Sequence, residues 1–199
     1  MITKLVAVAM IALPSAGAFA KTYTVDKEHT NVGFTVKHLM ISKVRGRFDQ
    51  FSGEFTYDEK QKTFKDVKAS IDVDSINTNE KERDKHLKSP DFFGVDLKNP
   101  KAPGNTMTFA MTSYSPTKSG GGKATGDLTI KGITKKVELD IEEGGFAKDP
   151  WGNERAAFTA RGKINRKDFG LNWNKLVEAG GVMVGEEVEL IIEAQGIAK

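Results

Sequence analysis

The sequence predicts an all-β protein built from eight antiparallel strands. Apolar and polar residues alternate along most of the chain, glycine-rich turns separate the alternating segments, and helical patterns are few and short. Alternation with a period of two places one face of each strand in the core and the other in water. Eight such strands either close into a barrel or split into a sandwich.

Each strand is predicted from its own alternating run. In the first run, Val32, Phe34 and Val36 share one face of the strand, and Gly33, Thr35 and Lys37 share the other. The eight runs cover residues 32–37, 51–57, 67–74, 107–112, 124–130, 137–142, 156–164 and 187–194, with a short addition at 23–25. Turn residues at 118–122, 131–134 and 149–153 favour hairpins and therefore antiparallel neighbours.

Two short helices are expected outside the sheet. Residues 78–87, capped by Asn77 or Thr78, are mostly charged, and Leu87 is almost their sole apolar residue. Because a helix with so little apolar surface cannot lie in a core, we expect a surface helix over one end of the sheet. A second helix is predicted over residues 172–178, anchored by Trp173, Leu176 and Val177.

The first 20 residues are predicted to be a cleaved signal peptide. They combine a single charge at Lys4, an apolar run over residues 5–13, and Ala18-Phe19-Ala20, which is typical of a signal peptidase site. The apolar run is about half as long as a bilayer-spanning helix, and no later run approaches that length. We therefore expect export to the periplasm and one mature domain over residues 21–199, with no membrane span.

Composition excludes several classes of function. The chain has no cysteine, which removes disulfides, iron–sulfur clusters and thiolate chemistry. Lys and Arg number 30 against 27 Asp and Glu, and the net charge of +3 is spread along the chain, so nucleic-acid binding is not expected. The three histidines lack the spacing of a metal site, and no G-x-S-x-G motif specifies a nucleophile.

Small residues on the predicted inward faces favour a cavity. These residues are Gly53, Ala69, Ala124, Gly126, Ala156, Ala160, Gly162 and Ala194. Because protein interiors are close-packed, such residues leave a void unless something else fills it. The alternative is that they ease the curvature of the sheet. An eight-stranded barrel is just wide enough for one small ligand, and a lining of Phe, Met, Val and Ala suits a long lipid.

Three polar residues could meet the head group of such a ligand. His38 falls on the same face of the first predicted strand as its apolar residues, Arg47 lies between two strand patterns, and His86 ends the charged helix. These groups suit a phosphate, a pyrophosphate or a quinone oxygen. Each also has a structural explanation: a strand-end position for His38, a solvated loop for Arg47, and a favourable helix C-terminus for His86.

A set of short motifs runs in order through the whole mature chain. They are Tyr23-Thr24-Val25-Asp26, HTNVGFTVKH at 29–38, Gly46-Arg47-Phe48, SINT at 75–78, HLKSPDFF at 86–93, GDLTIKG at 126–132 and NRKDFGL at 165–171. In this combination they resemble the YceI family of periplasmic, polyisoprenoid-binding, lipocalin-like proteins. Gly33 is a mild departure, because family members often carry another small or β-branched residue there.

The resemblance implies an eight-stranded antiparallel, extended, lipocalin-like barrel that holds a long isoprenoid in an apolar cavity. It implies a non-catalytic carrier of a polyprenyl phosphate, an isoprenoid quinone or a precursor, with no other cofactor. The positions that match family motifs and could meet the head group are His38, Arg47, His86 and Asp91. The alternation itself predicts a cavity wall that includes Phe34, Val36, Phe55, Ala69, Ile71, Met107, Phe109, Met111, Leu128, Phe158, Ala160 and Leu190.

Two other functions stay open at this point. An enzyme could use the same barrel to act on an isoprenoid head group through His38 or His86. A surface interaction module would instead have a filled sandwich and an exposed apolar patch. An exposed strand edge or the charged helix could also support a homodimer.

Overall fold

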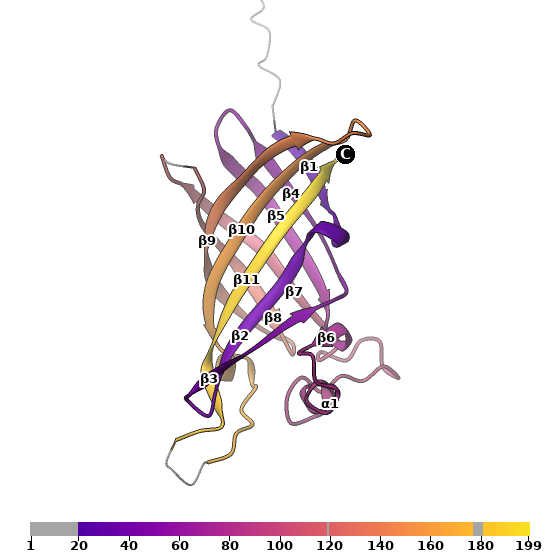
Figure 1. The fold of residues 1–199 in the computed structure, drawn as a ribbon, viewed down its shortest axis with the longest axis vertical. Coiled ribbons are helices and arrows are strands. Elements are labelled where there is room, and N and C mark those ends of the chain that lie inside the picture. The colour runs from indigo at the N-terminus through magenta and orange to yellow at the C-terminus, as the bar shows by residue number, and fades with distance from the viewer. Residues whose placement is uncertain (1–19, 119, 177–180) are drawn as a thin grey trace, which may run out of the picture.

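The computed structural model describes residues 20–118, 120–176 and 181–199, and most of them lie in antiparallel strands around one barrel (Figure 1). The predicted signal peptide, residues 1–20, lies outside the described residues except for Ala20, which begins the first strand. The strands are β1 (Ala20–Val25), β2 (Asn31–His38), β3 (Ser42–Phe48), β4 (Phe51–Asp58), β5 (Thr63–Asp72), β6 (Ile76–Asn77), β7 (Thr106–Pro116), β8 (Gly122–Ile130), β9 (Ile133–Lys148), β10 (Glu154–Asn165) and β11 (Val184–Ala198).

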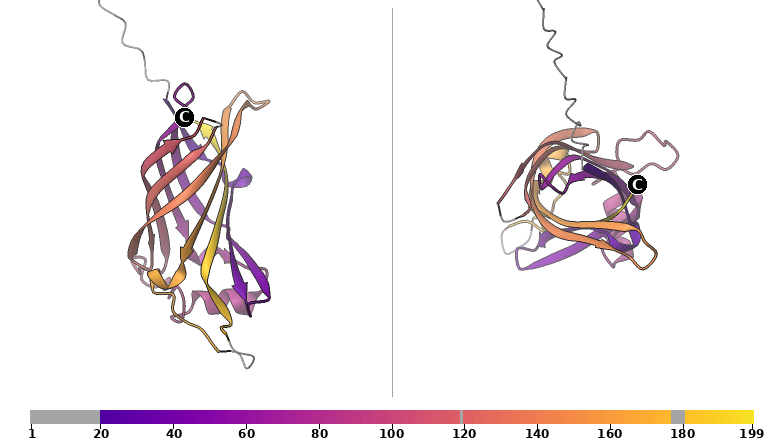
Figure 2. Two further views of the ribbon diagram at one scale, coloured as in Figure 1. Left: turned by 90° about the vertical axis from the view of Figure 1, so that its left-hand side faces the viewer. Right: turned by 90° about the horizontal axis from the view of Figure 1, so that it is seen from above.

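Eight of these strands close the barrel. Hydrogen-bonded neighbours follow the order β1-β4-β5-β7-β8-β9-β10-β11, and β11 pairs back onto β1. Every pair in this ring is antiparallel, and the view along the barrel shows a continuous circle of strands (Figure 2). The predicted fold class, an eight-stranded antiparallel barrel with a short charged surface helix, is confirmed.

The barrel closes differently at its two ends. At the end that carries the C-terminus, here called the terminal end, β1 lies between β11 and β4. At the opposite end, here called the helix end, β2 pairs with β11 in place of β1, and β3 and β6 continue the wall. The 3-10 turn η1 (Lys27–His29) bends the chain between β1 and β2.

The alternation did not predict β3. Arg47, which was expected between two strand patterns, lies within this strand opposite Gly33 of β2. The pattern is hidden because Gly46 stands where an apolar residue would complete the alternation from Val44 to Phe48. The ring of Phe34 occupies that space, since a Cβ on Gly46 would lie 2.4 Å from Phe34 Cζ.

The charged surface helix begins later than the sequence predicted. Helix α1 (Lys81–Lys88) follows Glu80, whose carboxylate accepts hydrogen bonds from the backbone N–H groups of the first turn. Thr78, expected as a cap, instead donates its hydroxyl to Asp84 and accepts a hydrogen bond from Arg83. Glu80 therefore replaces Asn77 or Thr78 as the residue that caps the helix.

The helix predicted over residues 172–178 is wrong in its described part. Residues 172–176 are not helical, and residues 177 and 178 lie outside the described residues. The Asn174 side chain bonds both the N–H and the C=O of Val184, which holds this segment against the start of β11. Trp173 packs against His86 and Phe92 near α1.

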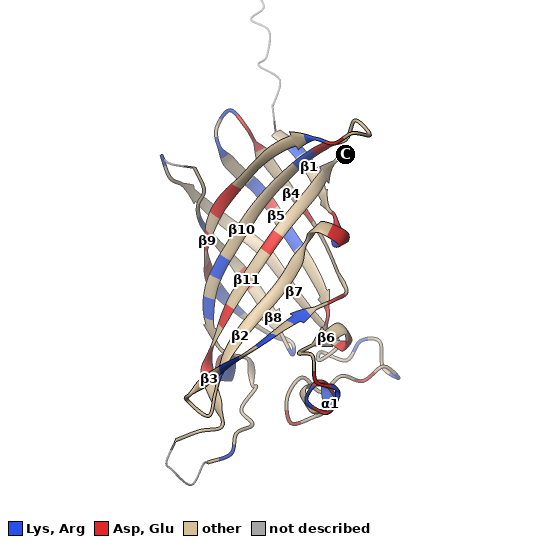
Figure 3. Ribbon diagram, viewed as in Figure 1, with Lys and Arg blue, Asp and Glu red and all other residues tan. Residues whose placement is uncertain are grey.

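Apolar side chains fill both ends of the barrel, and charged residues of both signs follow its strands (Figure 3). Ion pairs such as Lys123–Glu138 (2.6 Å) and Lys163–Glu187 (2.9 Å) join neighbouring strands on the exposed face. Such surface pairs contribute little to the free energy of unfolding, so the buried apolar clusters supply most of the stability of the fold. No described helix has the length and apolar character needed to cross a membrane.

Candidate ligand-binding cavity

An apolar cavity of about 240 Å³ lies inside the barrel. A single water molecule needs roughly 10–15 Å³ of such space, so the cavity is far larger than an ordinary packing defect. All eight ring strands contribute to its wall, together with β2, β3, β6 and α1. The charged and hydroxyl-bearing residues of the wall are Thr30, Ser52, Glu54, Lys68 and Arg166.

The structure places all twelve predicted wall residues around this cavity. They are Phe34, Val36, Phe55, Ala69, Ile71, Met107, Phe109, Met111, Leu128, Phe158, Ala160 and Leu190. The alternation located them because each strand presents every second residue to the interior. That these residues contact a ligand stays a prediction.

The small residues shape the cavity in two ways. Four alanines from the predicted set, Ala69, Ala124, Ala160 and Ala194, line it directly. Gly126 and Gly162 instead give room to a large side chain on the next strand. A Cβ on Gly126 would lie 2.3 Å from Phe109 Cζ, and a Cβ on Gly162 would lie 2.5 Å from Leu139 Cδ2. The expectation that all the small residues face the void is therefore corrected.

A layer of aromatic rings ends the cavity toward the terminal end. Phe55, Phe64 and Phe158 line the cavity, and the ring of Phe158 lies 5.1 Å from each of the other two. Behind them, Tyr23 stacks on Phe55 at 5.0 Å and Tyr57 packs on Phe64 at 4.8 Å. Tyr23 and Tyr57 are almost fully buried and are not part of the wall.

The helix end of the cavity is covered by α1 and the loop that follows it. Leu87, Phe92 and Phe93 from this segment line the cavity. Lys131 Nζ, from the β8–β9 turn, donates a hydrogen bond to the Phe92 carbonyl oxygen at 2.7 Å, and Lys88 pairs with Asp74 at 3.0 Å. The segment thus packs apolar side chains inward and is tied to the barrel by polar contacts.

Two of the four predicted head-group residues lie together beside this cover. His86 Nε2 and Asp91 Oδ2 form a hydrogen bond of 2.9 Å, and their side chains are 41% and 55% exposed. The His86 ring also packs edge-on against Trp173 and Phe92. Neither His86 nor Asp91 lines the cavity, so a role in binding a head group stays a prediction.

The other two predicted head-group residues lie elsewhere. His38 is half-buried at the end of β2, and Arg47 is exposed on β3, where its Nε donates to Asp49 at 2.7 Å. Neither residue is part of the cavity wall. In the described ranges, no group of three or more His, Asp or Glu side chains is placed to hold a metal ion.

Arg166 is a buried charged residue of the wall that sequence reasoning missed. It lies in the 3-10 turn η3 (Arg166–Phe169), and only 3% of its surface is exposed. The alternation in the sequence does contain a signal for Arg166. It is the next alternate residue after Ala160, Gly162 and Ile164, which share the inward face of their strand.

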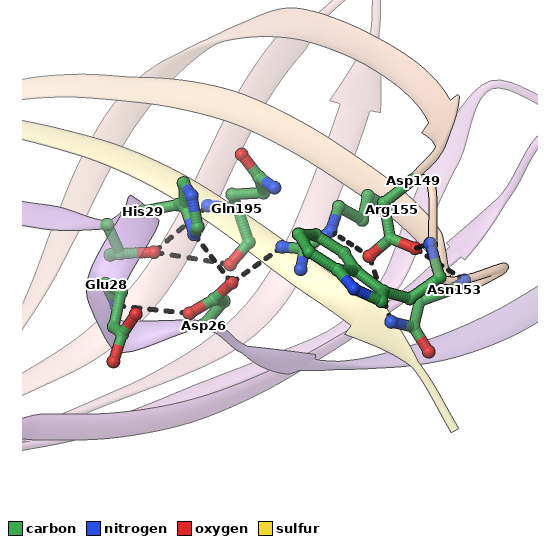
Figure 4. Close-up of polar contacts among 9 residues, drawn as sticks. Asp26, Glu28, His29, Asp149, Asn153, Arg155 and Gln195 are labelled. Carbon is green, nitrogen blue, oxygen red and sulfur yellow. Dashed lines mark hydrogen bonds and ion pairs between the residues drawn. The ribbon is translucent and has the colours of Figure 1, made fainter.

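A polar network on the outer side of the barrel fixes the bend between β1 and β2 (Figure 4). Arg155 of β10 donates to Asp26 at 2.6 Å and to Asp149 at 2.8 Å. The hydrogen bond from Arg155 lowers the pKa of Asp26. Burial acts to raise the pKa of Asp149, but hydrogen bonds from Asn153 and Arg155 outweigh it and lower the pKa to about 2. Both carboxylates are therefore ionised at neutral pH and hold the bend in place.

A closed eight-stranded antiparallel barrel around an apolar cavity defines the class of lipocalin-like proteins. Within this class, the family model of the YceI-like domain matches residues 23–196. A UPF0312 protein of Pectobacterium carotovorum is 43% identical over 197 residues, which cover 97% of this chain and 94% of the relative. The chain belongs to the YceI family.

Solved structures of other proteins have the same fold. The YCEI protein of Campylobacter jejuni superposes with a TM-score of 0.69 at 38% identity, covering 89% of this chain and 98% of that one. A polyisoprenoid binding domain from Saccharophagus degradans gives a TM-score of 0.57 at 14% identity, covering 89% and 98% of the two chains. The second likeness concerns the fold alone.

Proposed function

We propose that the protein binds a long isoprenoid or related lipid inside the barrel and carries it without changing it chemically. The observation that carries this proposal is the apolar cavity of about 240 Å³ with its wall of Phe, Met, Val, Ile, Leu and Ala side chains. Such a wall offers almost no hydrogen-bond partners along its length, so it selects for hydrocarbon. The Saccharophagus domain of the same fold is described as polyisoprenoid-binding.

Burial of hydrocarbon supplies the affinity in this proposal. Each methylene-sized group removed from water contributes about 0.8 kcal/mol, so a five-carbon isoprene unit contributes about 3–4 kcal/mol before ordering costs. Four units contribute about 12–16 kcal/mol before these costs, which leaves enough for micromolar binding when the costs are several kcal/mol. The catalytic alternative needs a reactive group at the ligand, and His38 and His86, the two residues considered for it, do not line the cavity.

We further propose that the carrier acts in the periplasm as a mature chain that begins at Lys21. The support is the sequence of the first 20 residues, with its short apolar run and Ala18-Phe19-Ala20.

The same purification tests both the export proposal and the carrier proposal. Protein taken from the periplasmic fraction should have the intact mass of residues 21–199, and organic extraction followed by mass spectrometry should release a long apolar molecule. A full-length chain would refute the export proposal, and a chain with no extractable lipid that also fails to bind added prenyl lipids would refute the carrier proposal.

Substitutions in the wall provide the matching test of the site. Ala160→Trp fills the cavity and Phe109→Arg places a charge in it, so each should reduce lipid binding at least about tenfold while the barrel still folds. Ala110→Trp is the matched control, because Ala110 is exposed on the outer face of β7 beside Phe109. Affinity would be measured by titration with a fluorescent prenyl lipid, and circular dichroism would confirm the fold. Unchanged affinity in both wall variants would show that the lipid binds elsewhere.

A further inference from the structure

The turn between β2 and β3 exposes three consecutive apolar residues at the helix end. Leu39, Met40 and Ile41 are 36%, 53% and 86% exposed. The Leu39 N–H donates to the Met183 carbonyl oxygen at 2.8 Å, and a Cβ on Gly181 would lie 3.8 Å from Met40 Cγ. The segment that leads into β11 therefore lies beside this turn.

That segment adds a fourth exposed apolar side chain. Leu176 is 86% exposed, and its backbone forms a β-bridge with Val182. The β2–β3 hairpin and the segment before β11 both lie at the helix end (Figure 1). We call the side chains of Leu39, Met40, Ile41 and Leu176 the apolar tip.

The backbone of the turn makes the residue types informative. The Ile41 N–H donates to the His38 carbonyl oxygen at 3.2 Å, and the two residues between them, Leu39 and Met40, have φ values of 51° and 61°. A turn with two positive φ angles favours Asn and Gly, because a Cβ crowds the backbone in the left-handed region. Leucine and methionine are unfavourable for this backbone and remain largely exposed, so an intramolecular contact does not explain them.

Basic side chains lie on the outer face of the hairpin behind the apolar tip. Lys37 of β2 is opposite Lys43 of β3, and Arg45 lies on the same face two residues further along β3 (Figure 3). Lys43 pairs with Glu189 at 2.9 Å. Within the described part of the chain, Lys37, Arg45 and Lys175, the residue before Leu176, form no ion pair with a carboxylate.

The acidic residues nearby do not compensate these three cations. Glu186 and Glu187, at the start of β11, pair with Lys167 and Lys163. The apolar tip is therefore bordered by an excess of positive charge.

This combination fits an anionic bilayer surface better than a second copy of the chain. Apolar side chains enter the boundary of the acyl chains, and neighbouring Lys and Arg side chains contact anionic head groups. A symmetric contact between two copies would instead bring the same cations together, which is repulsive. The apolar tip also lies at the end of the barrel opposite the aromatic layer.

We infer that the apolar tip docks the protein on a bilayer that contains anionic phospholipids. The tip side chains insert between the head groups, and Lys37, Arg45 and Lys175 bind the lipid phosphates. This inference goes beyond the proposed function, because it concerns the outer surface of the barrel and not the cavity. Docking of this kind turns the helix end toward the membrane.

The first test measures the insertion of the apolar tip by sedimentation of purified protein with vesicles. The vesicles contain equal parts of phosphatidylglycerol and phosphatidylcholine. Ile41→Glu should weaken wild-type binding at least about tenfold, because it replaces an apolar side chain with a charge that the head groups repel. Trp151→Glu is the matched control, since Trp151 is 82% exposed in the β9–β10 turn at the terminal end, and it should bind as wild type does.

The second test measures the contribution of the cations. Wild-type protein should bind vesicles of phosphatidylcholine alone at least about fivefold more weakly than the anionic vesicles, and added salt should reduce the difference. The double variant Lys37→Gln with Arg45→Gln should lose at least about fivefold in binding to the anionic vesicles. Lys148→Gln with Arg161→Gln removes the same charge from exposed positions of β9 and β10 and should keep the binding.

Several results would overturn the inference. They are no binding of wild type to the anionic vesicles, unchanged binding of either test variant, or an equal loss in its control. A wild-type dimer that Ile41→Glu separates into monomers would show that the tip joins two copies instead. Should Ile41→Glu fail to fold, as judged by circular dichroism, Leu176→Glu takes its place with the same expected loss.

The titration with a fluorescent prenyl lipid tests the cavity separately. Ile41→Glu should bind that lipid as wild type does, because Ile41 is not part of the cavity wall. Failure of wild type to bind it would refute the proposed function and leave the docking inference standing. Loss of vesicle binding alone would do the reverse.

Discussion

At the scale of single residues, glycines determine where the large side chains of the wall can lie. Gly46 is opposite Phe34 in the β2–β3 pair, and the ring of Phe34 covers the space that a Cβ would need. Gly126 of β8 lies opposite Met111 of β7, and a Cβ on it would lie 2.3 Å from Cζ of the nearby Phe109. In both cases an aromatic ring from the neighbouring strand occupies the space beside the glycine.

Gly46→Ala tests this arrangement. The new methyl group would lie 2.4 Å from Phe34 Cζ and 2.9 Å from Thr78 Cγ2, so either the ring or the strand must move. Overpacking of this kind typically costs about 1–3 kcal/mol. We expect a loss of that size in the free energy of unfolding, measured by urea denaturation.

The double variant Gly46→Ala with Phe34→Leu separates the clash from other effects. Leucine lacks the ring atoms that meet the new methyl group, so the two substitutions together should destabilise less than the sum of the single variants. Strict additivity would show that Gly46 is needed for another reason.

The residues of the wall could largely be predicted from the sequence, but the polar groups could not. Strict alternation in β7 and β8 located Met107, Phe109 and Leu128, because a half-buried strand leaves a regular pattern. The polar contacts of Arg166 depend on how residues 171, 184 and 185 fold back on it, and no local pattern encodes that approach. His86 and Asp91 are adjacent because the loop after α1 turns back on the helix.

At the scale of elements, the bend between β1 and β2 is held by groups from two strands, β10 and β11, and from the turns at η1 and between β9 and β10. Asp26 caps η1 and accepts hydrogen bonds from His29 and Arg155, while Asp149 joins Arg155 to the β9–β10 turn. Gln195 of β11 accepts hydrogen bonds from the Asp26 N–H and the Thr30 hydroxyl through its carbonyl oxygen. The network therefore stabilises the point where β2 replaces β1 at the edge of β11.

This network predicts a specific acid sensitivity. The pKa values of Asp26 and Asp149 are lower in the folded protein than the ordinary value of 3.8, so their contribution to stability is fully present above pH 3.8. It should be lost as the pH falls toward 2, where the carboxylates take up protons in the folded state. We expect the melting temperature to drop steeply between pH 3.8 and 2.

Arg155→Met should lower stability at pH 7 and flatten this acid transition, because it removes the shared partner of both carboxylates. Arg161→Met is the matched control, since Arg161 is an exposed arginine on the same strand. The measurement is the melting temperature as a function of pH for the three proteins. Equal acid profiles for wild type and Arg155→Met would contradict the role assigned to the network.

Elements with strong local patterns were predicted well, and elements defined by their partners were not. The hairpins at 131–134 and 149–153 follow from turn residues, and both are present. Strand β3 was missed because Gly46 interrupts its alternation, and its identity as a strand depends on pairing with β2. In its described part, 172–176, the helix expected over 172–178 is absent, and the Asn174 side chain instead holds this segment against Val184.

At the scale of the whole molecule, the barrel is a closed wall with two unlike ends. Strand pairing closes the wall, aromatic rings close the terminal end, and α1 with its following loop covers the helix end. The strands could be predicted individually, but their order around the barrel depends on contacts between distant segments, such as β1 with β11. Such long-range pairing leaves no mark in a local pattern.

A ligand that binds only the folded barrel should stabilise the whole molecule. At a free concentration 100 times the dissociation constant, binding adds about 2.7 kcal/mol to the free energy of unfolding. For a chain of this size that corresponds to an increase in melting temperature of roughly 5–10 °C. Calorimetry of lipid-stripped protein with and without geranylgeranyl monophosphate checks this, and at the same lipid concentration Ala160→Trp should show about half of that increase or less.

The aromatic layer of Phe55, Phe64 and Phe158 has a consequence for the proposed function. A hydrocarbon chain that enters from the helix end would advance only as far as these rings. A shorter chain would leave unfilled space against them, and a longer chain would have to fold back or protrude. We therefore expect the position of the three phenylalanines to limit how many isoprene units fit in the cavity.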